Sequence, residues 1–408
     1  MNNQELIPHL FRTEFRKITS VLGKLLGMNR LEMAEDIASE TFLAAMETWP
    51  FKGIPENPTA WLYTVAKNKA RNLIIRDSLF NSKIVGDVKK LVDKNEVFID
   101  WSDKNIFDSQ LQMLFALCHP SIPIEAQIGL SLRILCGFGI DEIANAFLTN
   151  KEAINKRLFR AKEKLREEKV AIEFPNETEI PKRLDTVLQT LYLLFSEGYY
   201  SESSESVLRE DLCLEAMRLT HLLTEYEPTN QPNVNALLSL MSFHASRFEA
   251  RKDEKGELIL YDDQDESKWN QQLIAQGIYF LNKASQGSTI SKYHLEAGIA
   301  YWHTQKNDTH EKWESILQLY NQLLTIEYSP IAALNRTFAL SKANGKKEAI
   351  IEAEKLQLTN NHFYFMLLGE LYSDTDQAKA KQHFQKALAF ARTQPDKVTI
   401  QKRIEQLL

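Results

Sequence analysis

Apolar side chains recur every three to four positions along most of the chain, which is the period of an amphipathic α-helix. The pattern is clear over residues 33–49 and 61–76 and returns over 151–165. Strong helix formers fill these stretches, whereas Gly (14) and Pro (12) are scarce among the 408 residues. We therefore predict an all-α fold.

The stretch 139–168 predicts two short helices joined by a tight turn. Their apolar faces would consist of Ile140, Ile143, Ala144 and Phe147, and of Ile154, Leu158, Ala161 and Leu165. Thr149 and Glu152 fit a T-x-x-E capping box, which places the start of the second helix near Lys151. Two such helices are typical of a helix-turn-helix, whose second helix enters the DNA major groove. The alternative is a solvated surface helix whose cations are balanced by its own four glutamates.

The second of these helices is rich in cations and amides outside its apolar face. Its exposed N-terminal side chains would meet base edges, and the basic side chains toward its end would meet phosphates. The candidate DNA-binding residues are Lys151, Asn155, Lys156, Arg157 and Arg160.

Another basic helix is predicted over 61–76, which contains four basic residues and no acidic one. Cations, amides and nearby aromatic rings are the combination that single-stranded or melted DNA requires. Trp61 has an alternative place in the core of the domain. The candidate residues are Trp61, Lys67, Asn68, Arg71 and Asn72.

Three sequence blocks, in this order, resemble the extracytoplasmic-function sigma factors of bacterial RNA polymerase. They read A-E-D…E-T-F-L…W from 34, W-L…V-A-K-N…R-N…R-D from 61, and E-I-A…I-N-K-R-L-F-R-A-K-E-K-L-R from 142. The resemblance implies a sigma region 2 domain over 1–78, a linker over 79–105 and a sigma region 4 helix-turn-helix domain over 106–172.

The resemblance also implies roles for individual positions. Asp36, Glu40 and Phe42 match the helix that docks on the clamp helices of the β′ subunit of core RNA polymerase. The 50–58 loop and the candidate residues of 61–76 match the segment that captures the melted minus-ten element of promoter DNA. The candidates of the helix-turn-helix match the reader of the minus-35 element. Ser39 departs from the family, which often has Gln there, and the turn at 147–149 lacks the family's usual Gly.

The rest of the chain divides into a helical connecting domain, 173–290, and a repetitive part, 291–408. The block 184–270 looks like the domain that joins sigma regions to repeats in one long subgroup of the family. Segments from 291 onward resemble tetratricopeptide repeats, which stack into a superhelix whose groove takes a protein or peptide partner. The best match is formed by Leu368, Gly369, Tyr372, Ala380, Phe384 and Ala387.

Charge separates the two halves of the chain. Residues 1–170 hold 24 Lys and Arg against 22 Asp and Glu, and residues 171–408 hold 25 against 33, within a net charge of -6. A mildly basic N-terminal part and an acidic C-terminal part indicate that the two parts have different partners. Because the two halves are tethered, contact between them is favoured, and we expect the tail to regulate the N-terminal part in cis.

The sequence offers no motif for catalysis, a cofactor or a metal. It has no P-loop, HExxH, GxSxG or glycine fingerprint for nucleotides. The acidic residues around Asp263 lack the pattern of an EF-hand, and pairing with Arg247 and Arg251 is the simpler expectation for them. The missing motifs favour a protein that is not an enzyme. Three widely spaced cysteines, no signal peptide and no long apolar run indicate a cytoplasmic protein.

Two functions from different classes remain open at this point. The first is a transcription initiation factor that binds core RNA polymerase, recognises and melts promoters, and is regulated in cis by its helical C-terminal half. The second is a DNA-binding adaptor whose repeats recruit protein partners without sigma activity. The presence of Asp36, Glu40 and Phe42 favours the first.

Overall fold

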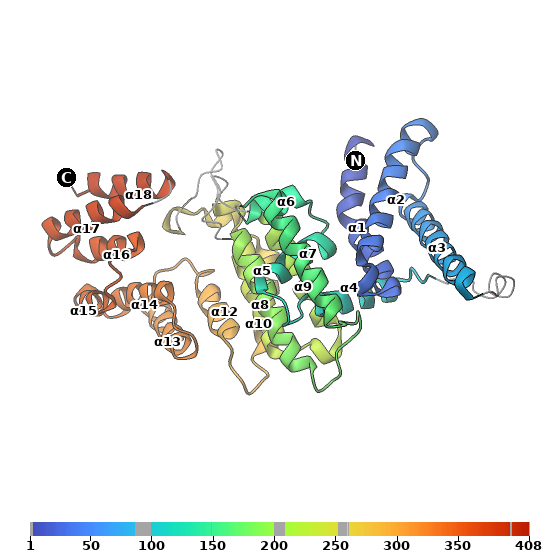
Figure 1. Ribbon diagram of the computed structural model, residues 1–408. Coiled ribbons are helices and arrows are strands. Elements are labelled where there is room, and N and C mark those ends of the chain that lie inside the picture. The colour runs from blue at the N-terminus through green and yellow to red at the C-terminus, as the bar shows by residue number, and fades with distance from the viewer. Residues whose placement is uncertain are drawn as a thin grey trace. The chain divides into compact units, whose positions relative to one another are not determined.

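The computed structural model describes residues 3–85, 99–147, 149–199, 209–251, 259, 261–391 and 394–407. Every regular element in these ranges is a helix, which confirms the all-α prediction (Figure 1). Residues 1–194 and 195–408 form two compact units. No helix within the described ranges is long and apolar enough to cross a membrane.

The first unit opens with three helices, α1 (Asn3–Leu26), α2 (Leu31–Lys52) and α3 (Pro58–Val85). The three helices share one apolar core, and α2 packs against both of its neighbours (Figure 1). Gly53 ends α2 with a φ of +84°, a conformation that favours glycine, and its N–H donates to the Trp49 carbonyl oxygen at 3.0 Å. The chain can therefore turn sharply from α2 into α3.

Four more helices follow in the same unit: α4 (Asp103–Leu117), α5 (Ile124–Leu135), α6 (Ile140–Ala146) and α7 (Lys151–Glu167). The side chain of Ser102 caps α4 by accepting from the Asn105 N–H. Both ends of the predicted linker, 79–105, are thus helical, because α3 continues to Val85 and α4 begins at Asp103. The middle of that linker, 86–98, lies outside the described residues.

The turn between α6 and α7 corrects one detail of the sequence prediction. Helix α7 begins at Lys151 as predicted, but its N-cap is Asn150 and not Thr149. The Asn150 side-chain oxygen accepts from the Ala153 N–H at 2.8 Å and so satisfies one of the free donors at the helix start. The backbone N–H of Thr149 donates to the Ala144 carbonyl oxygen, and this hydrogen bond closes the turn between α6 and the N-cap of α7.

Helix α8 (Ile180–Tyr199) is continuous across the boundary between the two units. Its first part packs on the helices before it: Arg183 donates to the Phe115 carbonyl oxygen, and the Thr190 hydroxyl donates to the Gln127 side chain at 2.8 Å. The predicted end of the helix-turn-helix domain at 172 therefore falls before the last helix that packs against it.

The second unit continues with α9 (Glu210–Glu225), α10 (Pro232–Ala245) and α11 (Gln271–Ala284). Helix α10 is the centre of this group, since it packs on α9, α11 and α12 and buries most of its side chains. Buried hydroxyl groups on such a helix need hydrogen-bond partners inside the protein. The Ser239 hydroxyl donates to the Gly277 carbonyl oxygen at 2.8 Å.

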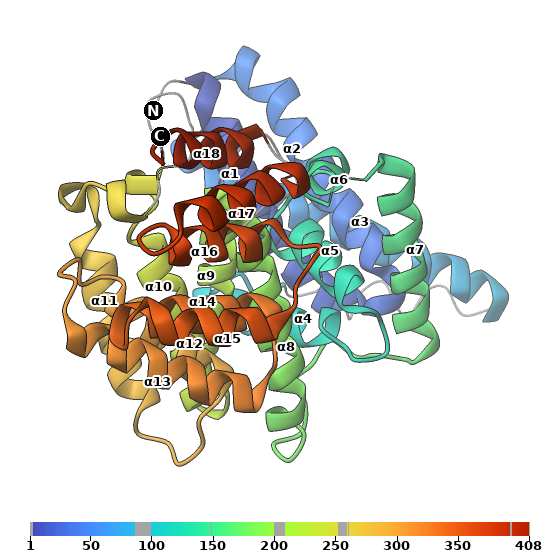
Figure 2. The ribbon, with the colours of Figure 1, turned by 90° about the vertical axis from the view of Figure 1, so that its left-hand side faces the viewer.

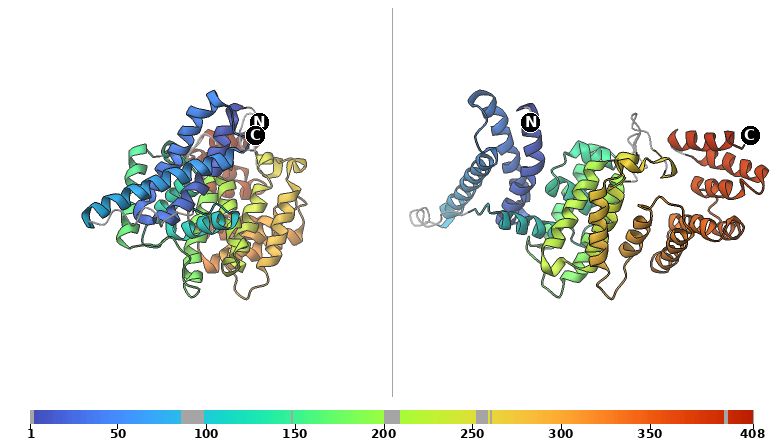
Figure 3. Two further views of the ribbon diagram at one scale, coloured as in Figure 1. Left: turned by 90° about the vertical axis from the view of Figure 1, so that its right-hand side faces the viewer. Right: turned by 180° about the vertical axis from the view of Figure 1, so that it is seen from behind.

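The chain then runs through a series of antiparallel helices (Figures 2 and 3). Each helix packs on the next in sequence order, and α14 also packs on α16. One apolar core runs through the series. The helices are α12 (Lys292–Trp302), α13 (His310–Ile326), α14 (Pro330–Ala343), α15 (Lys346–Leu356), α16 (His362–Tyr372), α17 (Gln377–Phe390) and α18 (Gln394–Glu405).

Gly369 lets α16 and α17 approach each other closely. A Cβ atom at this position would lie 2.5 Å from Cε1 of Phe384, far inside van der Waals contact. The six residues that carried the repeat pattern are all buried here, as the pattern requires. The close approach explains why a residue without a side chain stands in the middle of α16.

We expect Gly369→Ala to lower the free energy of unfolding by about 1–3 kcal/mol, because the added methyl group overpacks the core. This cost should exceed the gain of about 0.5–1 kcal/mol that alanine brings to a helix interior. Thermal unfolding of the full chain measures the change. Phe384→Leu removes the ring atoms that the methyl would meet, so the two substitutions should be non-additive. A Gly369→Ala protein with a raised Tm would contradict the packing described.

Candidate nucleic-acid and protein interface

The outer side of α2 combines carboxylates with apolar side chains. Asp36 and Glu40 are exposed and lie one turn apart. Met33 and Leu43, which are 38% and 53% exposed, continue the same face because residues three and four apart on a helix are neighbours. Exposed apolar side chains rimmed by polar ones are typical of a protein-binding surface.

Phe42, the third predicted docking residue, does not lie on this face. It is 2% exposed, and its ring meets that of Phe11 edge-on with centroids 5.0 Å apart. The ring therefore holds α2 against α1, and the prediction that Phe42 contacts a partner does not fit the structure.

The exposed side of α3 presents amides and cations. Asn68, Arg71 and Asn72 are exposed there, while Lys67 is half-buried. Lys69 donates to Glu40 of α2 at 2.7 Å, a surface ion pair that water and salt weaken. Four of the five candidates for melted DNA thus lie on one helix with polar atoms within reach of solvent.

Trp61, the fifth candidate, is half-buried and takes the alternative place foreseen for it. Its ring packs edge-on against Trp49 with centroids 5.4 Å apart, so much of its surface is used to join α3 to α2. Tyr63 is also held by contacts inside the protein. Its ring stacks on Trp101, and its hydroxyl donates to the Glu14 carboxylate at 2.6 Å. Burial, helped by this hydrogen bond, raises the pKa of Tyr63.

The predicted 50–58 loop is shorter in the structure, because α2 continues through Pro50 to Lys52. The connection itself comprises residues 53–57. Phe51, on the last turn of α2, is 88% exposed. An aromatic ring so open to solvent, just before the connection from α2 to α3, is suited to stacking on an unpaired base.

The candidates on α7 are presented to solvent along one side of the helix. Lys151, Asn155, Lys156 and Arg160 are exposed, whereas Ile154, Leu158, Ala161 and Leu165 are buried as predicted. The Lys151 ammonium group pairs with Asp141 at 2.9 Å. The Arg157 guanidinium lies 5.7 Å from the centre of the Phe147 ring, so this fifth candidate partly supports the turn.

Sequence reasoning missed Phe159, which is 61% exposed on α7. It follows Asn155 by four residues and Lys156 by three, and so it lies among the candidate DNA-binding side chains. A phenyl ring at such a place can contact the methyl group of thymine in the major groove. The signal was present, because Phe159 stands outside the apolar stripe that Leu158 and Ala161 continue.

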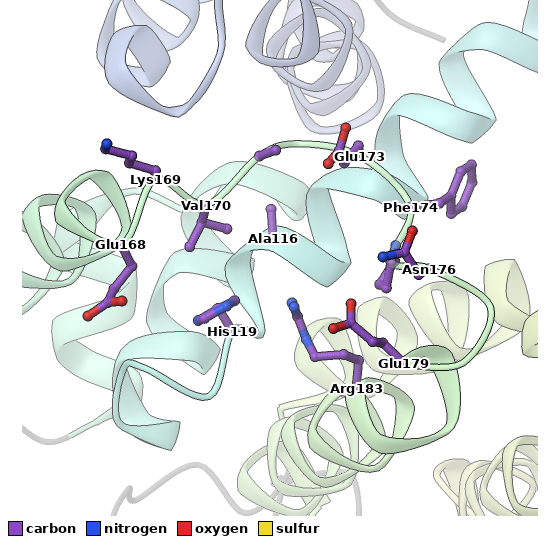
Figure 4. A pocket seen from close by; sticks show the side chains of 12 residues that line it. Ala116, His119, Glu168, Lys169, Val170, Glu173, Phe174, Asn176, Glu179 and Arg183 are labelled. Carbon is purple, nitrogen blue, oxygen red and sulfur yellow. The ribbon is translucent and has the colours of Figure 1, made fainter.

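A polar pocket of about 220 Å³ lies where the chain passes from α7 to α8 (Figure 4). His119 and Arg183 reach toward each other there, from the loop after α4 and from α8. Burial and the Arg183 charge lower the pKa of His119. Because Arg183 also donates to the Phe115 carbonyl oxygen, this region serves to tie α8 to the end of α4.

Arg247 and Arg251 lie against aromatic rings in the second unit. The Arg247 guanidinium carbon is 5.4 Å from the centre of the Tyr261 ring, and that of Arg251 is 3.9 Å from the centre of the Tyr199 ring. Asp265 caps its own turn, and hydrogen bonds from Ser267 lower its pKa. Cation–π contacts thus take the place of the predicted arginine–carboxylate pairs among the described side chains. The side chain of Asp262 lies outside them.

Comparison with known proteins adds three findings. Residues 10–78, which cover most of α1 to α3, match the family model of sigma-70 region 2. Residues 183–285 match that of a family of unknown function (DUF6596). Over 396 residues the chain is 31% identical to the uncharacterized protein R00370 of Rhizobium meliloti, which covers 95% of this chain and 93% of that protein. No solved structure matches the chain.

Proposed function

The chain belongs to the same family as R00370 and carries a sigma-70 region 2, and on this premise we propose that it is a transcription initiation factor of the extracytoplasmic-function type. It would bind core RNA polymerase and recognise and melt promoter DNA. The observation that carries the proposal is the match of residues 10–78 to sigma-70 region 2. On this proposal the chain catalyses no reaction itself and works in the cytoplasm.

Polymerase docking is assigned to the outer face of α2. The buried side of the helix fixes it to α1 and α3, which leaves Asp36, Glu40 and Leu43 in one exposed row. Such a row offers a partner both charge complementarity and apolar contact. The clamp helices of the β′ subunit are the partner that the family resemblance implies.

Promoter binding is assigned to two separate grips. The first consists of Phe51 with Lys67, Asn68, Arg71 and Asn72, which would hold unpaired bases of the minus-ten element. The second is the exposed side of α7 in the α6–α7 helix-turn-helix, which would read the minus-35 element. Because phosphate contacts release counterions, each grip alone should bind weakly and lose affinity with salt.

The C-terminal half is proposed to control this activity in cis. Support comes from α8, which packs on the helix-turn-helix domain and continues without a break into the second unit. The helical repeats from α12 onward resemble tetratricopeptide repeats and would take a protein or peptide partner. Run-off transcription with purified core polymerase and the full-length chain tests the proposed function.

Substitutions on α7 should separate base reading from phosphate contact. Asn155→Ala with Lys156→Ala, or Phe159→Ala alone, should relax sequence preference at one or two upstream positions, at about 1–3 kcal/mol per lost base contact. Arg160→Ala should weaken binding to all sequences nearly equally and lower the salt slope by about one. Binding to a library of duplexes at several salt concentrations measures both effects. Identical effects of these substitutions would mean that α7 does not read bases.

A further inference from the structure

Two arginines inside the second unit lie against the same tyrosine. Arg247, just after α10, is only 8% exposed, and its Nη2 donates to the Tyr199 hydroxyl at 3.4 Å. Arg251, four residues later, is half-buried, and its guanidinium carbon lies 3.9 Å from the centre of the Tyr199 ring. Among the described side chains neither arginine forms an ion pair, and the Nε atom of Arg247 is buried without a hydrogen-bond partner.

The surroundings of Arg247 are basic as well. The ring of Tyr261 faces Arg247 on one side and Lys312 of α13 on the other contact, with 5.4 Å and 5.2 Å from the ring centre to the guanidinium carbon and to Nζ. Burial and the charges of Arg247 and Lys312 lower the pKa of His303 to about 3, so this imidazole is neutral at pH 7. Positive charges from separate elements thus act together on one largely buried region.

Two buried arginines without an anion are costly for the folded protein. Removing a cation from water costs more than a cation–π contact returns, and a neutral hydroxyl group supplies no opposite charge. The aromatic rings therefore hold the two guanidinium groups in place but do not neutralise them. An anion that binds here recovers part of this cost, since buried charges in proteins are commonly paired. Because Arg251 is only half-buried, an ion can approach it from solvent.

The charge of the two arginines decides which anion suits them. We propose that Arg247 and Arg251 bind a phosphoryl group, carried either by inorganic phosphate or by a small phosphorylated metabolite. A phosphate ester carries a charge of about -1.5 to -2 at pH 7, which matches two guanidinium groups better than a single carboxylate does. The planar guanidinium group also fits two phosphate oxygens at once. Neither arginine belongs to the surfaces assigned to polymerase or promoter, so the inference does not depend on the proposed function.

Titration of the full chain with inorganic phosphate tests the site, with ionic strength held constant by potassium chloride. Calorimetry should show one phosphate bound per chain, and the Tm of the second unit should rise by about 5–10 °C at a concentration about 100 times the Kd. Adenosine monophosphate and glycerol phosphate are the further arms. An ester that binds at least about ten-fold more tightly than phosphate would identify a metabolite as the source, and equal or weaker binding would identify free phosphate. Absence of saturable binding of all three would overturn the proposal.

The substitution Arg251→Gln separates binding from a structural role. It should weaken phosphate binding by about 10- to 100-fold, because a charge-assisted hydrogen bond is lost. Arg251→Lys, which keeps the charge, should bind phosphate with intermediate affinity. A purely structural role would instead lower the Tm equally with and without phosphate.

Arg336→Gln is the matched control, because it removes the same charge from α14, where Arg336 pairs with Glu352 and donates to Asn321. The control should bind phosphate like the unaltered chain. Unchanged phosphate affinity in the Arg251→Gln chain, or the same loss in the control, would overturn the proposal.

Discussion

Reversing Asp36 and Glu40 to lysine is expected to abolish binding of the chain to core RNA polymerase while leaving its fold intact. Both side chains are exposed, and Glu40 makes only a surface ion pair with Lys69. Placing like charges against a complementary partner costs several kcal/mol, which corresponds to a loss of at least about 100-fold in affinity. The same reversals cost the free chain little, since surface substitutions usually change stability by less than about 0.5 kcal/mol.

Affinity for purified core polymerase, measured beside thermal unfolding of the variant, checks this expectation. Glu225→Lys with Glu227→Lys is the matched control, because both residues are exposed in the second unit and the change in net charge is the same. The control should bind like the unaltered chain. If the Asp36 and Glu40 variant binds equally well, the outer face of α2 is not the docking surface.

Cutting the chain after residue 172 is expected to destabilise the helices from α4 to α7 strongly. The cut removes α8, whose residues Arg183 and Thr190 bond to α4 and α5. Val187 and Leu194 share that face of α8 by their spacing and are fully buried. Losing the burial of these two side chains alone costs about 3–6 kcal/mol, out of a typical total of about 5–15 kcal/mol.

Fragment 1–199 keeps α8 and is the matched comparison for fragment 1–172. Thermal unfolding and limited proteolysis should show α4 to α7 folded in the longer fragment and loosened in the shorter. Equal unfolding temperatures would show that α8 does not stabilise these helices. Because of this effect, loss of transcription by fragment 1–172 alone would not demonstrate regulation by the tail, whereas a change seen with fragment 1–199 would.

Helical periodicity identified the helices well, whereas the resemblance that placed Phe42 on the docking face did not show which of two adjacent apolar residues enters the core. On α2 the sequence offers Phe42 and Leu43, and the structure buries the first against Phe11 and exposes the second. On α7 the same choice followed from the sequence, since the predicted apolar stripe included Leu158, which is buried, and left out Phe159, which is exposed. On α2 the choice depends on which neighbouring helix approaches and from which side.

Contacts between residues far apart in sequence could not be predicted from the helical periodicity either. Glu35 meets Lys162 across 127 positions, and Thr190 meets Gln127 across 63. Read singly, Glu35 resembles any surface carboxylate of an amphipathic helix, and the sequence does not show that it is buried in ion pairs with Arg133 of α5 and Lys162 of α7. The exposure of the candidate DNA-binding side chains on α7, in contrast, followed from its apolar stripe alone.

Run-off transcription is the measurement that tests the central claim most directly. Purified core polymerase, the full-length chain and a library of promoter fragments should together give transcripts from a small set of related promoters, and core polymerase alone should give none of them. The variant with Asp36→Lys and Glu40→Lys should lose these transcripts, and the Glu225 and Glu227 control should keep them. If the chain binds DNA through α7 yet never directs polymerase to a start site, it is an adaptor and not an initiation factor.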